Sequence, residues 1–331
     1  MKKILKIIFF LFLILILLFL GYFFVGISKP NEKITFGVNF SQAHAQKLGL
    51  SWKETYLALL QDLKVKEIKL LTQWDLLEPE KGKYQFSDLD WQIQKAKEAG
   101  ANLILVIGMK TGRWPECHLP TWALNLKPQE IQERVLKLIE KIVLRYQNVE
   151  NIWAWQVENE PFFPFGKCPF KITPQFLKEE IELVKKLDPK KRPVIVSDSG
   201  EGSFWIKAAL LGDIVGITLY KTVWIKELGI YFTYPFPPIF YQRKANLIKK
   251  IFKKDIICVE LQAEPWGPTL LYYLPEEEEE KSMNLKKFLE IVDFAKKTGI
   301  EKFYFWGAEW WYQKKLKDKP YFWEEAKKLF S

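Results

Sequence analysis

The chain has 331 residues, of which 48% are hydrophobic and 16% aromatic, and it carries a formal net charge of +10. A chain this apolar can bury a large core, so its composition excludes an intrinsically disordered protein. The basic balance does not indicate nucleic-acid binding, because the lysines are interspersed with glutamates and no basic cluster dominates.

Residues 1–28 are predicted to be a membrane anchor or a signal segment. After a basic start, positions 7 to 25 hold no charged residue, which is 25 − 7 + 1 = 19 positions. That is near the roughly 20 residues with which a helix crosses a bilayer, and longer than the about 7–15 apolar residues of a secretory signal. We favour an uncleaved anchor that leaves the rest of the chain outside the plasma membrane. A cleaved signal, which would make the protein secreted, remains the alternative.

Residues 33–331 are predicted to form one catalytic domain. Short β-rich apolar runs alternate with amphipathic helical stretches, which indicates parallel β-α-β units. The predicted strands are 34–39, 67–72, 102–107, 152–157, 193–198, 214–219, 256–260 and 302–306. The predicted helices are 51–63, 89–99, 128–146, 173–187, 204–211, 240–252, 285–297 and 322–330. Eight strands in this pattern indicate an α/β protein with a closed (β/α)₈ TIM barrel, preceded by a single transmembrane helix.

Two of the connections are unusual in composition. Residues 221–238 are too apolar for an ordinary surface loop, so we expect them to line a cleft or, alternatively, to contact a membrane or a neighbouring chain. Residues 276–280 are five consecutive glutamates and are predicted to be a solvated loop.

The cysteines and histidines give no indication of a metal site or cofactor. Cys258 lies in an apolar run and is expected in the core. Cys117 and Cys168 lie in loops and could form a disulfide in an oxidising compartment, a pairing that the sequence leaves open. The chain has only two histidines and no Cys-x-x-Cys pair, so we expect no metal and no cofactor.

Carboxylates follow two of the predicted strands. The fourth strand runs into Glu158-Asn159-Glu160, and the seventh ends in Glu260, with Glu264 four residues on. In a TIM barrel the carboxyl ends of the strands carry the active site. Two carboxyl groups that face each other there can split a glycosidic bond, one as the acid and the other as an ionised nucleophile or base.

Aromatic residues also gather after the strand ends, where their faces suit sugar rings. Tyr220 ends the sixth strand. The tryptophans that we expect near the site are Trp74, Trp114, Trp266, Trp306, Trp310 and Trp311.

On these residues the chain resembles clan A of the glycoside hydrolases, the retaining (β/α)₈ enzymes that include family 5 cellulases and mannanases, family 39 xylosidases and family 42 galactosidases. The resemblance is carried by Asn159-Glu160-Pro161 and Val259-Glu260, whose glutamates are 260 − 160 = 100 residues apart. It covers residues 34–311, including the segment from Trp74 to Asp90 after the second strand.

The resemblance implies roles for single residues. Glu160 would be the acid/base and Glu260 the nucleophile of a retaining hydrolysis. Asn159 would bind the sugar 2-hydroxyl, Tyr220 would hydrogen-bond the nucleophile, and Trp306 would lie under the sugar. The substrate would be a β-linked oligo- or polysaccharide, with the sugar, the linkage and the choice of endo or exo cleavage left open, as is the oligomeric state.

The sequence departs from the clan's pattern in two places. The clan usually has an arginine on the second strand, where this chain has Lys69, and the two residue types are not interchangeable in carboxylate geometry. Glu264 is a rival for the nucleophile, because Leu261-Gln262-Ala263 replaces the usual residues after Glu260. These departures keep two alternatives open: a non-catalytic carbohydrate-binding barrel, and a transglycosylase that remodels an envelope polysaccharide.

Overall fold

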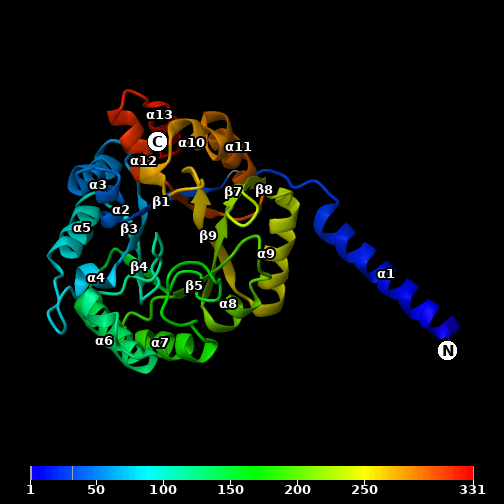
Figure 1. Cartoon of the computed structure of the whole chain (residues 1–331), viewed down its shortest axis with the longest axis horizontal. Coiled ribbons are helices and arrows are strands. Elements are labelled where there is room, and N and C mark those ends of the chain that lie inside the picture. Colours follow the sequence, from blue (N-terminus) through cyan, green and yellow to red (C-terminus); the bar gives the residue numbers. More distant parts are fainter. Residues whose placement is uncertain (1, 32, 331) are drawn as a thin grey trace.

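In a computed structural model of the chain, which describes residues 2–31 and 33–330, eight parallel strands close into a barrel (Figure 1). Around the barrel the order is β1-β10-β9-β6-β5-β4-β3-β2. These strands are Thr35–Phe40 (β1), Glu67–Leu71 (β2), Asn102–Ile107 (β3), Ile152–Val157 (β4), Val194–Asp198 (β5), Ile214–Leu219 (β6), Asp255–Gln262 (β9) and Lys302–Trp306 (β10). The predicted TIM barrel is confirmed.

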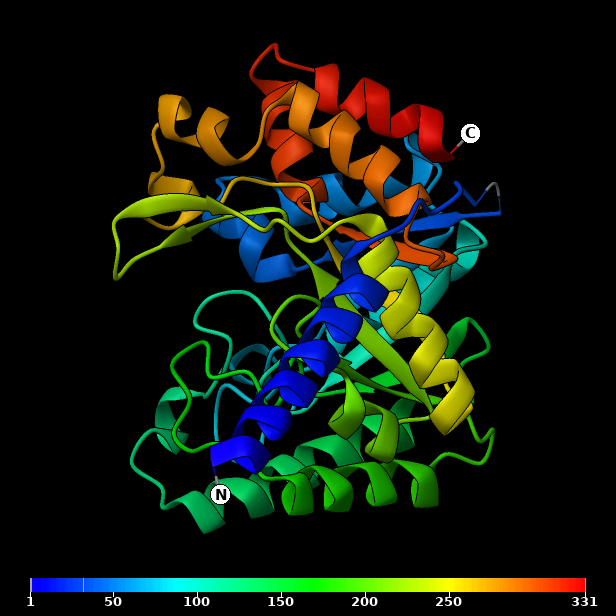
Figure 2. The ribbon, with the colours of Figure 1, turned by 90° about the vertical axis from the view of Figure 1, so that its right-hand side faces the viewer.

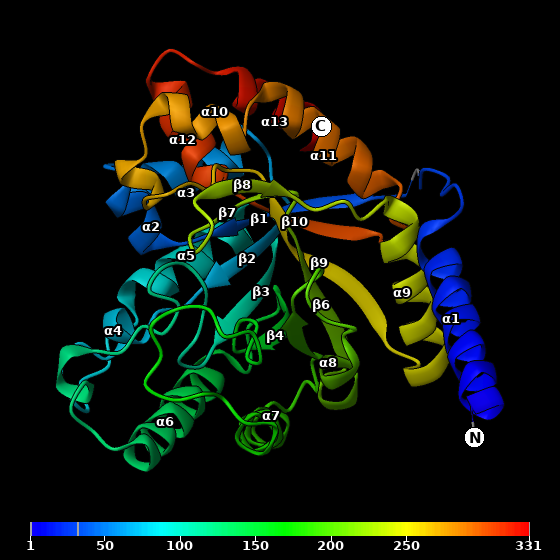
Figure 3. The same cartoon turned by 45° about the vertical axis from the view of Figure 1, so that its right-hand side comes forward.

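Helices surround the barrel on its outside (Figures 1 and 3). The longer ones are α3 (Trp52–Gln61), α5 (Ser87–Glu98), α6 (Pro128–Tyr146), α7 (Pro174–Leu187), α9 (Pro238–Phe252), α11 (Leu285–Lys296), α12 (Ala308–Leu316) and α13 (Tyr321–Phe330). The shorter ones are α2 (Gln42–Lys47), α4 (Trp74–Leu77), α8 (Ile206–Leu211), η1 (Thr121–Ala123) and η2 (Leu271–Tyr273).

The apolar core has two parts, because each strand presents alternate side chains to the inside and the outside of the barrel. The larger part lies between the strands and the helices. The smaller part fills the barrel interior and consists of Ile104, Ala154, Ile195, Ile257, Val259 and Tyr304. The interior is therefore packed, and polar side chains gather where the strands end.

The five consecutive glutamates do not form the solvated loop predicted from the sequence. They begin helix α10 (Glu276–Ser282), in which Glu279 is buried. Its carboxylate forms an ion pair with Lys314 and accepts a hydrogen bond from Trp310 Nε1 at 3.2 Å. Acidic residues in the first turn suit the positive end of the helix dipole, so the run favours a helix once Glu279 has a buried partner.

The apolar segment after β6 forms a hairpin. Strands β7 (Thr222–Ile225) and β8 (Ile230–Thr233) pair antiparallel outside the barrel (Figure 2). Gln262 at the end of β9 holds the hairpin in place, because its amide accepts from the backbone of Lys221 and Thr222 and donates to Thr222 O. Gln262, one of the three residues after Glu260 that depart from the clan's pattern, therefore has a structural role: it holds the hairpin.

Helix α1 (Lys2–Phe24) precedes the barrel and projects away from it (Figure 1). Over Lys3–Phe24 it is long and apolar enough to cross a membrane, as judged by length and composition.

Candidate active site

The two glutamates singled out in the sequence come together beside strand β6. Thr218 of β6 is the register partner of Glu260 on β9, and its hydroxyl donates a hydrogen bond to Glu160 Oε1 at 3.0 Å. One threonine thus contacts the Glu160 carboxyl group and is paired with Glu260 in the sheet, at the carboxyl ends of the strands, which is where TIM-barrel enzymes place their chemistry.

A β-bulge turns the side chain of Glu260 toward the barrel interior. Ile217 and Thr218 are consecutive, but their partners on β9 are Cys258 and Glu260, so Val259 is an extra residue. The pairing with β10 shifts in the same stretch. In a regular strand Val259 and Glu260 would point to opposite faces. The bulge lets Val259 pack inside while Glu260 also reaches the interior.

Glu160 is fixed by a strained turn after β4. Glu158 and Glu160 have positive φ values of 59° and 43°, a conformation that residues with a side chain adopt at a cost. The Glu160 N–H donates to Ser197 Oγ at 2.8 Å. Lys110 Nζ donates to Glu160 O at 2.9 Å and to Phe163 O at 2.8 Å, so the turn is held from two sides.

The surroundings of Glu160 favour its protonated form. The residue is only 9% exposed. Burial raises the pKa of its carboxyl well above the usual value, and the negative charge of Glu260 raises it further. A carboxyl group in this state can donate a proton at neutral pH.

The Glu260 carboxyl group has two side-chain partners. Lys69 Nζ lies 3.2 Å from Oε1, and the Tyr220 hydroxyl donates to Oε2 at 2.8 Å. Lys69 is fully buried, so it does point into the barrel and supplies a cation beside the nucleophile candidate. Burial lowers the pKa of Lys69, and the charge of Glu260 opposes that shift. Burial also raises the pKa of Tyr220 well above its usual value, which keeps the phenol a donor.

Asn159 lies in the same network. Its Oδ1 accepts from Gln156 Nε2 at 3.0 Å and from Lys69 Nζ at 3.4 Å. The side chain therefore connects the turn after β4 to the cation beside Glu260.

Glu264, the rival for the nucleophile, is engaged elsewhere. It forms an ion pair with Arg113, and His44 Nε2 lies 3.4 Å from its Oε2. Burial alone would raise the pKa of Glu264, but the charges of Arg113 and His44 lower it to about 2. Arg113 also pairs with Glu309 at 3.1 Å and lies 3.9 Å from the ring centre of Trp306. Arg113 thus brings Glu264, Glu309 and Trp306 together.

Two buried polar residues at the site were not identified from the sequence. Burial, together with the charge of Glu260, raises the pKa of Glu116 to about 8. Asn39 on β1 donates to the backbone oxygens of Val259, Tyr304 and Phe305 at 2.9 to 3.2 Å, which holds the bulged part of β9 against β10. Asn39 ends a predicted strand and could have been considered, whereas Glu116 lies in a loop without any local signal.

Glu158, the first glutamate of the motif, is held by backbone hydrogen bonds. Its carboxylate accepts from the backbone N–H groups of Met109 and Lys110 and lies against Glu180 of α7. Burial, followed by the charge of Glu158, raises the pKa of Glu180 well above its usual value. Burial raises the pKa of Glu158 as well.

The predicted aromatic residues divide into two groups. The rings of Trp266 and Tyr220 lie 5.4 Å apart, and Phe165 packs against both Trp266 and Trp114. Trp306 lies 5.7 Å from Lys69 Nζ. By contrast, Trp74 is fully buried against Glu78 and Trp122. Trp310 and Trp311 are buried and pack on Phe322 and Phe288, and the Trp311 indole donates to Ala263 O, next to Glu264, at 2.7 Å.

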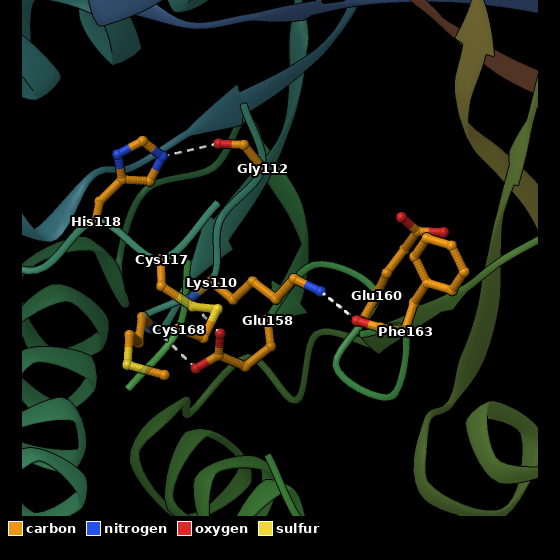
Figure 4. The surroundings of a disulfide bond; sticks show 9 residues. Lys110, Gly112, Cys117, His118, Glu158, Glu160, Phe163 and Cys168 are labelled. Atoms are coloured by element: carbon orange, nitrogen blue, oxygen red, sulfur yellow. Dashed lines mark hydrogen bonds between the residues drawn. A yellow bond between two sulfur atoms is a disulfide. The ribbon is translucent and has the colours of Figure 1, made fainter. Parts of the chain in front are cut away.

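A disulfide joins the two loops that flank Glu160. Cys117, after β3, is bonded to Cys168, after β4, with their Cα atoms 5.2 Å apart. In Figure 4 the Lys110 side chain extends from the disulfide region toward the backbone at Glu160 and Phe163, and the Glu160 carboxyl points away from the disulfide. The pairing that the sequence left open is present.

The described residues contain no group of three or more His, Cys, Asp or Glu side chains placed to hold a metal ion. One pocket lies beside the end of β2, and its lining includes Thr72, Gln73 and Asp88 but neither Glu160 nor Glu260. The two glutamates are buried, with 9% of Glu160 and 2% of Glu260 exposed.

Comparisons with known proteins support the resemblance to clan A. The model of glycosyl hydrolase family 10 matches residues 36–192. A GH5_18 glycoside hydrolase from Bifidobacterium longum subsp. longum, solved with Manβ1-4GlcNAc, is similar in structure at a TM-score of 0.59 and 14% identity, over 82% of this chain and 68% of that one. An endo-β-1,4-xylanase of family 10 from Gloeophyllum trabeum gives 0.56 and 15%, over 83% and 84%. Xylanase 10B from Thermotoga petrophila, solved with xylobiose, gives 0.55 and 15%, over 83% and 82%.

Proposed function

We propose that this chain is a retaining glycoside hydrolase for β-linked oligo- or polysaccharides, with Glu160 as acid/base and Glu260 as nucleophile. The observation that carries the proposal is the pairing of two buried carboxyl groups in different surroundings. The carboxyl of Glu160 has a raised pKa, and it lies beside a Glu260 carboxylate that is held by Lys69 and Tyr220.

The reaction proceeds in two steps. Glu160 donates its proton to the glycosidic oxygen while a Glu260 oxygen attacks the anomeric carbon, and the bond to the leaving alcohol breaks. Glu160, now ionised, then takes a proton from water. The resulting hydroxide attacks the anomeric carbon and releases Glu260, so the sugar leaves with its original configuration. Asn159, Trp306, Trp266 and Trp114 are assigned to substrate binding, and Trp74, which has no exposed surface, would support the loop after β2.

Glu264 is assigned to positioning rather than attack. Its carboxylate is engaged by Arg113 and His44, whereas Glu260 has a neutral phenol donor and a buried lysine. We also propose that α1 remains attached as a membrane anchor and holds the barrel outside the cytoplasm.

The test is hydrolysis of aryl β-glucosides, β-mannosides, β-xylosides and β-galactosides, followed by β-glucan, mannan and xylan, using the full chain in detergent micelles. We expect Glu160→Ala and Glu260→Ala each to reduce kcat by about 10²–10⁴-fold or more, the usual contribution of a positioned proton donor being of that order. Glu180→Gln is the matched control, because it changes an equally buried carboxyl group outside the pair.

A 2-deoxy-2-fluoro glycoside with a good leaving group then identifies the nucleophile. Its covalent adduct is expected on the peptide that contains Glu260. An adduct on Glu264 would transfer the role, and an inverted product would contradict the mechanism. Sugar binding without turnover would favour the binding barrel, and transfer to a sugar acceptor in preference to water would favour the transglycosylase.

A further inference from the structure

The end of helix α1 is docked on the barrel. Phe23 is buried against Phe204 and Phe240, and Phe24 packs on Phe236 and Phe240. Arg243 of α9 donates to Gly21 O at 3.3 Å and lies over the Tyr22 ring at 5.0 Å. Figure 2 shows α1 leaving the barrel from this contact with the start of α9, so the axis of α1 has a defined direction relative to the barrel.

The length of the apolar span sets the level of the bilayer along α1. Its 19 uncharged positions, 7 to 25, extend about 28 Å at a rise of about 1.5 Å per residue. The hydrocarbon core is about 30 Å thick, so these positions just cover it and place Val25 near its outer edge. Phe19, six residues earlier, is then about 9 Å below that edge.

A residue of the barrel contacts the span at this depth. The Phe204 ring lies 6.1 Å from the Phe19 ring and 6.3 Å from the Phe23 ring. Since both partners are within the apolar span, Phe204 cannot remain in bulk water while α1 crosses the membrane. Yet 52% of its surface is exposed to solvent in the isolated chain.

The residues next to Phe204 continue the apolar surface. Ile206 and Leu210 of α8 are 50% and 67% exposed. They are four positions apart in a helix, so they lie on the same face. Lipid headgroups attract basic side chains, and Lys207 follows Ile206 on α8 while Lys249 and Lys250 lie in the last turn of α9.

We infer that the barrel lies against the outer surface of the bilayer through a lipid-binding face made of Phe204, Ile206 and Leu210. This face enters the interfacial region of the membrane. The partner is a lipid surface, which distinguishes the inference from an anchor that merely tethers a freely tumbling barrel. It rests on α1 crossing the membrane and is independent of the catalytic activity.

The experiment uses the full chain in vesicles of phosphatidylcholine and phosphatidylglycerol. A single cysteine replaces Phe204 or Leu210 and carries an environment-sensitive fluorophore. The native thiols do not interfere, because Cys117 and Cys168 are bonded and Cys258 is buried. Leu316 and Leu124, which are 59% and 62% exposed, provide matched control positions elsewhere on the barrel. Leu15 of α1 is the control for the span itself.

Lipids with a nitroxide near the headgroup are expected to quench labels at Phe204 and Leu210 by about half or more, as for side chains buried in the interface. Labels at Leu316 and Leu124 are expected to keep their emission. A label at Leu15 should respond best to a nitroxide deep in the acyl chains. Quenching at Leu15 without quenching at Phe204 and Leu210 would show that α1 crosses the membrane but that the barrel does not contact the lipid surface. No quenching at any position would show that α1 does not cross. Either result overturns the inference without bearing on glycoside hydrolysis.

Discussion

Lys69 supplies the positive charge beside the proposed nucleophile, at the position where the resemblance to clan A led us to expect an arginine. Because it is fully buried and 3.2 Å from Glu260, its loss would leave a buried carboxylate without its cation. Hydrogen bonds to charged groups are worth about 1.5–3 kcal/mol. We therefore expect Lys69→Met to lower kcat/KM by roughly 10–150-fold on a soluble aryl glycoside, since about 1.4 kcal/mol corresponds to tenfold.

Lys69→Arg is the matched variant, since it returns the charge in a different geometry. Partial recovery relative to Lys69→Met would support an electrostatic role for the lysine. If Lys69→Met remained within threefold of the parent, Lys69 would be a structural residue only.

Thr218 allows a pH test of Glu160. Its hydroxyl donates to the carboxylate and so lowers the pKa of Glu160, against the larger upward effects of burial and of Glu260. Glu160 must be protonated to act as the acid, so kcat/KM falls as pH rises through its pKa. Thr218→Val removes the donor and should move this alkaline limb to higher pH, as measured by pH–rate profiles.

Two variants serve as controls for the pH test. Thr72→Val removes a hydroxyl that bonds to Val106 O instead and should leave the limb in place. Glu116→Gln removes the other carboxyl group that has a raised pKa near Glu260. If the alkaline limb of the pH–rate profile is still present in this variant, it belongs to Glu160. A limb that moves to lower pH in Thr218→Val would contradict the assignment.

The sequence predicted the residues that strand ends bring together, but not those that depend on loops or on irregular strands. Glu160, Glu260 and Tyr220 each lie near the carboxyl end of a strand, and the barrel places them in one network. Arg113 and Glu116 lie in a loop whose path is set by tertiary contacts. The inward direction of Glu260 depends on the bulge at Val259, which a strict two-residue alternation cannot reveal.

At the level of elements, the disulfide links the loops after β3 and β4. It closes a loop of 51 residues in sequence separation, for which chain entropy gives a stabilisation of about 4 kcal/mol, near the upper part of the usual range. We expect Cys117→Ser with Cys168→Ser to lower the free energy of unfolding by about 2–4 kcal/mol in urea titrations.

Activity should fall as well in this double variant, because the loop after β3, which the disulfide holds, carries Arg113 and Glu116. Cys258→Ser, at the buried free cysteine, is the control for a changed thiol that closes no loop. Unchanged unfolding in the double variant would show that the loops are held by their other contacts.

The sequence predicted the barrel strands better than it predicted helix α10 and the β7–β8 hairpin. The strand predictions 102–107, 152–157, 214–219 and 302–306 coincide with β3, β4, β6 and β10, because apolar β-rich runs between turn residues are a local signal. The prediction of a solvated loop at residues 276–280 was wrong because the helix there depends on a distant partner, Lys314. The hairpin β7–β8 was seen only as an apolar loop, since the amide of Gln262 that holds it comes from another strand.

At the scale of the molecule, the contact between α1 and the barrel fixes how the barrel is oriented on its anchor. Phe23→Ala with Phe24→Ala removes the aromatic packing on Phe240. We expect this double variant in vesicles to show faster anisotropy decay of a barrel-attached fluorophore, because the barrel gains freedom relative to α1.

Catalytic constants on a soluble substrate should stay within about twofold in this variant, because α1 docks on the outside of α9 and the site lies at the strand ends. Phe9→Ala with Phe10→Ala, at positions that are 62% and 60% exposed on α1, is the matched control. Equal anisotropy decay in the two double variants would mean that the aromatic contact does not orient the barrel.

The closure of the barrel by β1 and β10 has a consequence for biosynthesis. Thr35 pairs with Lys302, so the first strand receives its second neighbour only after the last one has been made. Phe40 and Trp306 are 306 − 40 = 266 residues apart, which a ribosome covers in roughly 13–53 s at about 5–20 residues per second. Throughout that interval β1 has an open edge able to pair with other chains. Translation speed between these two strands should therefore affect the yield of folded protein more than it affects the stability of the finished barrel.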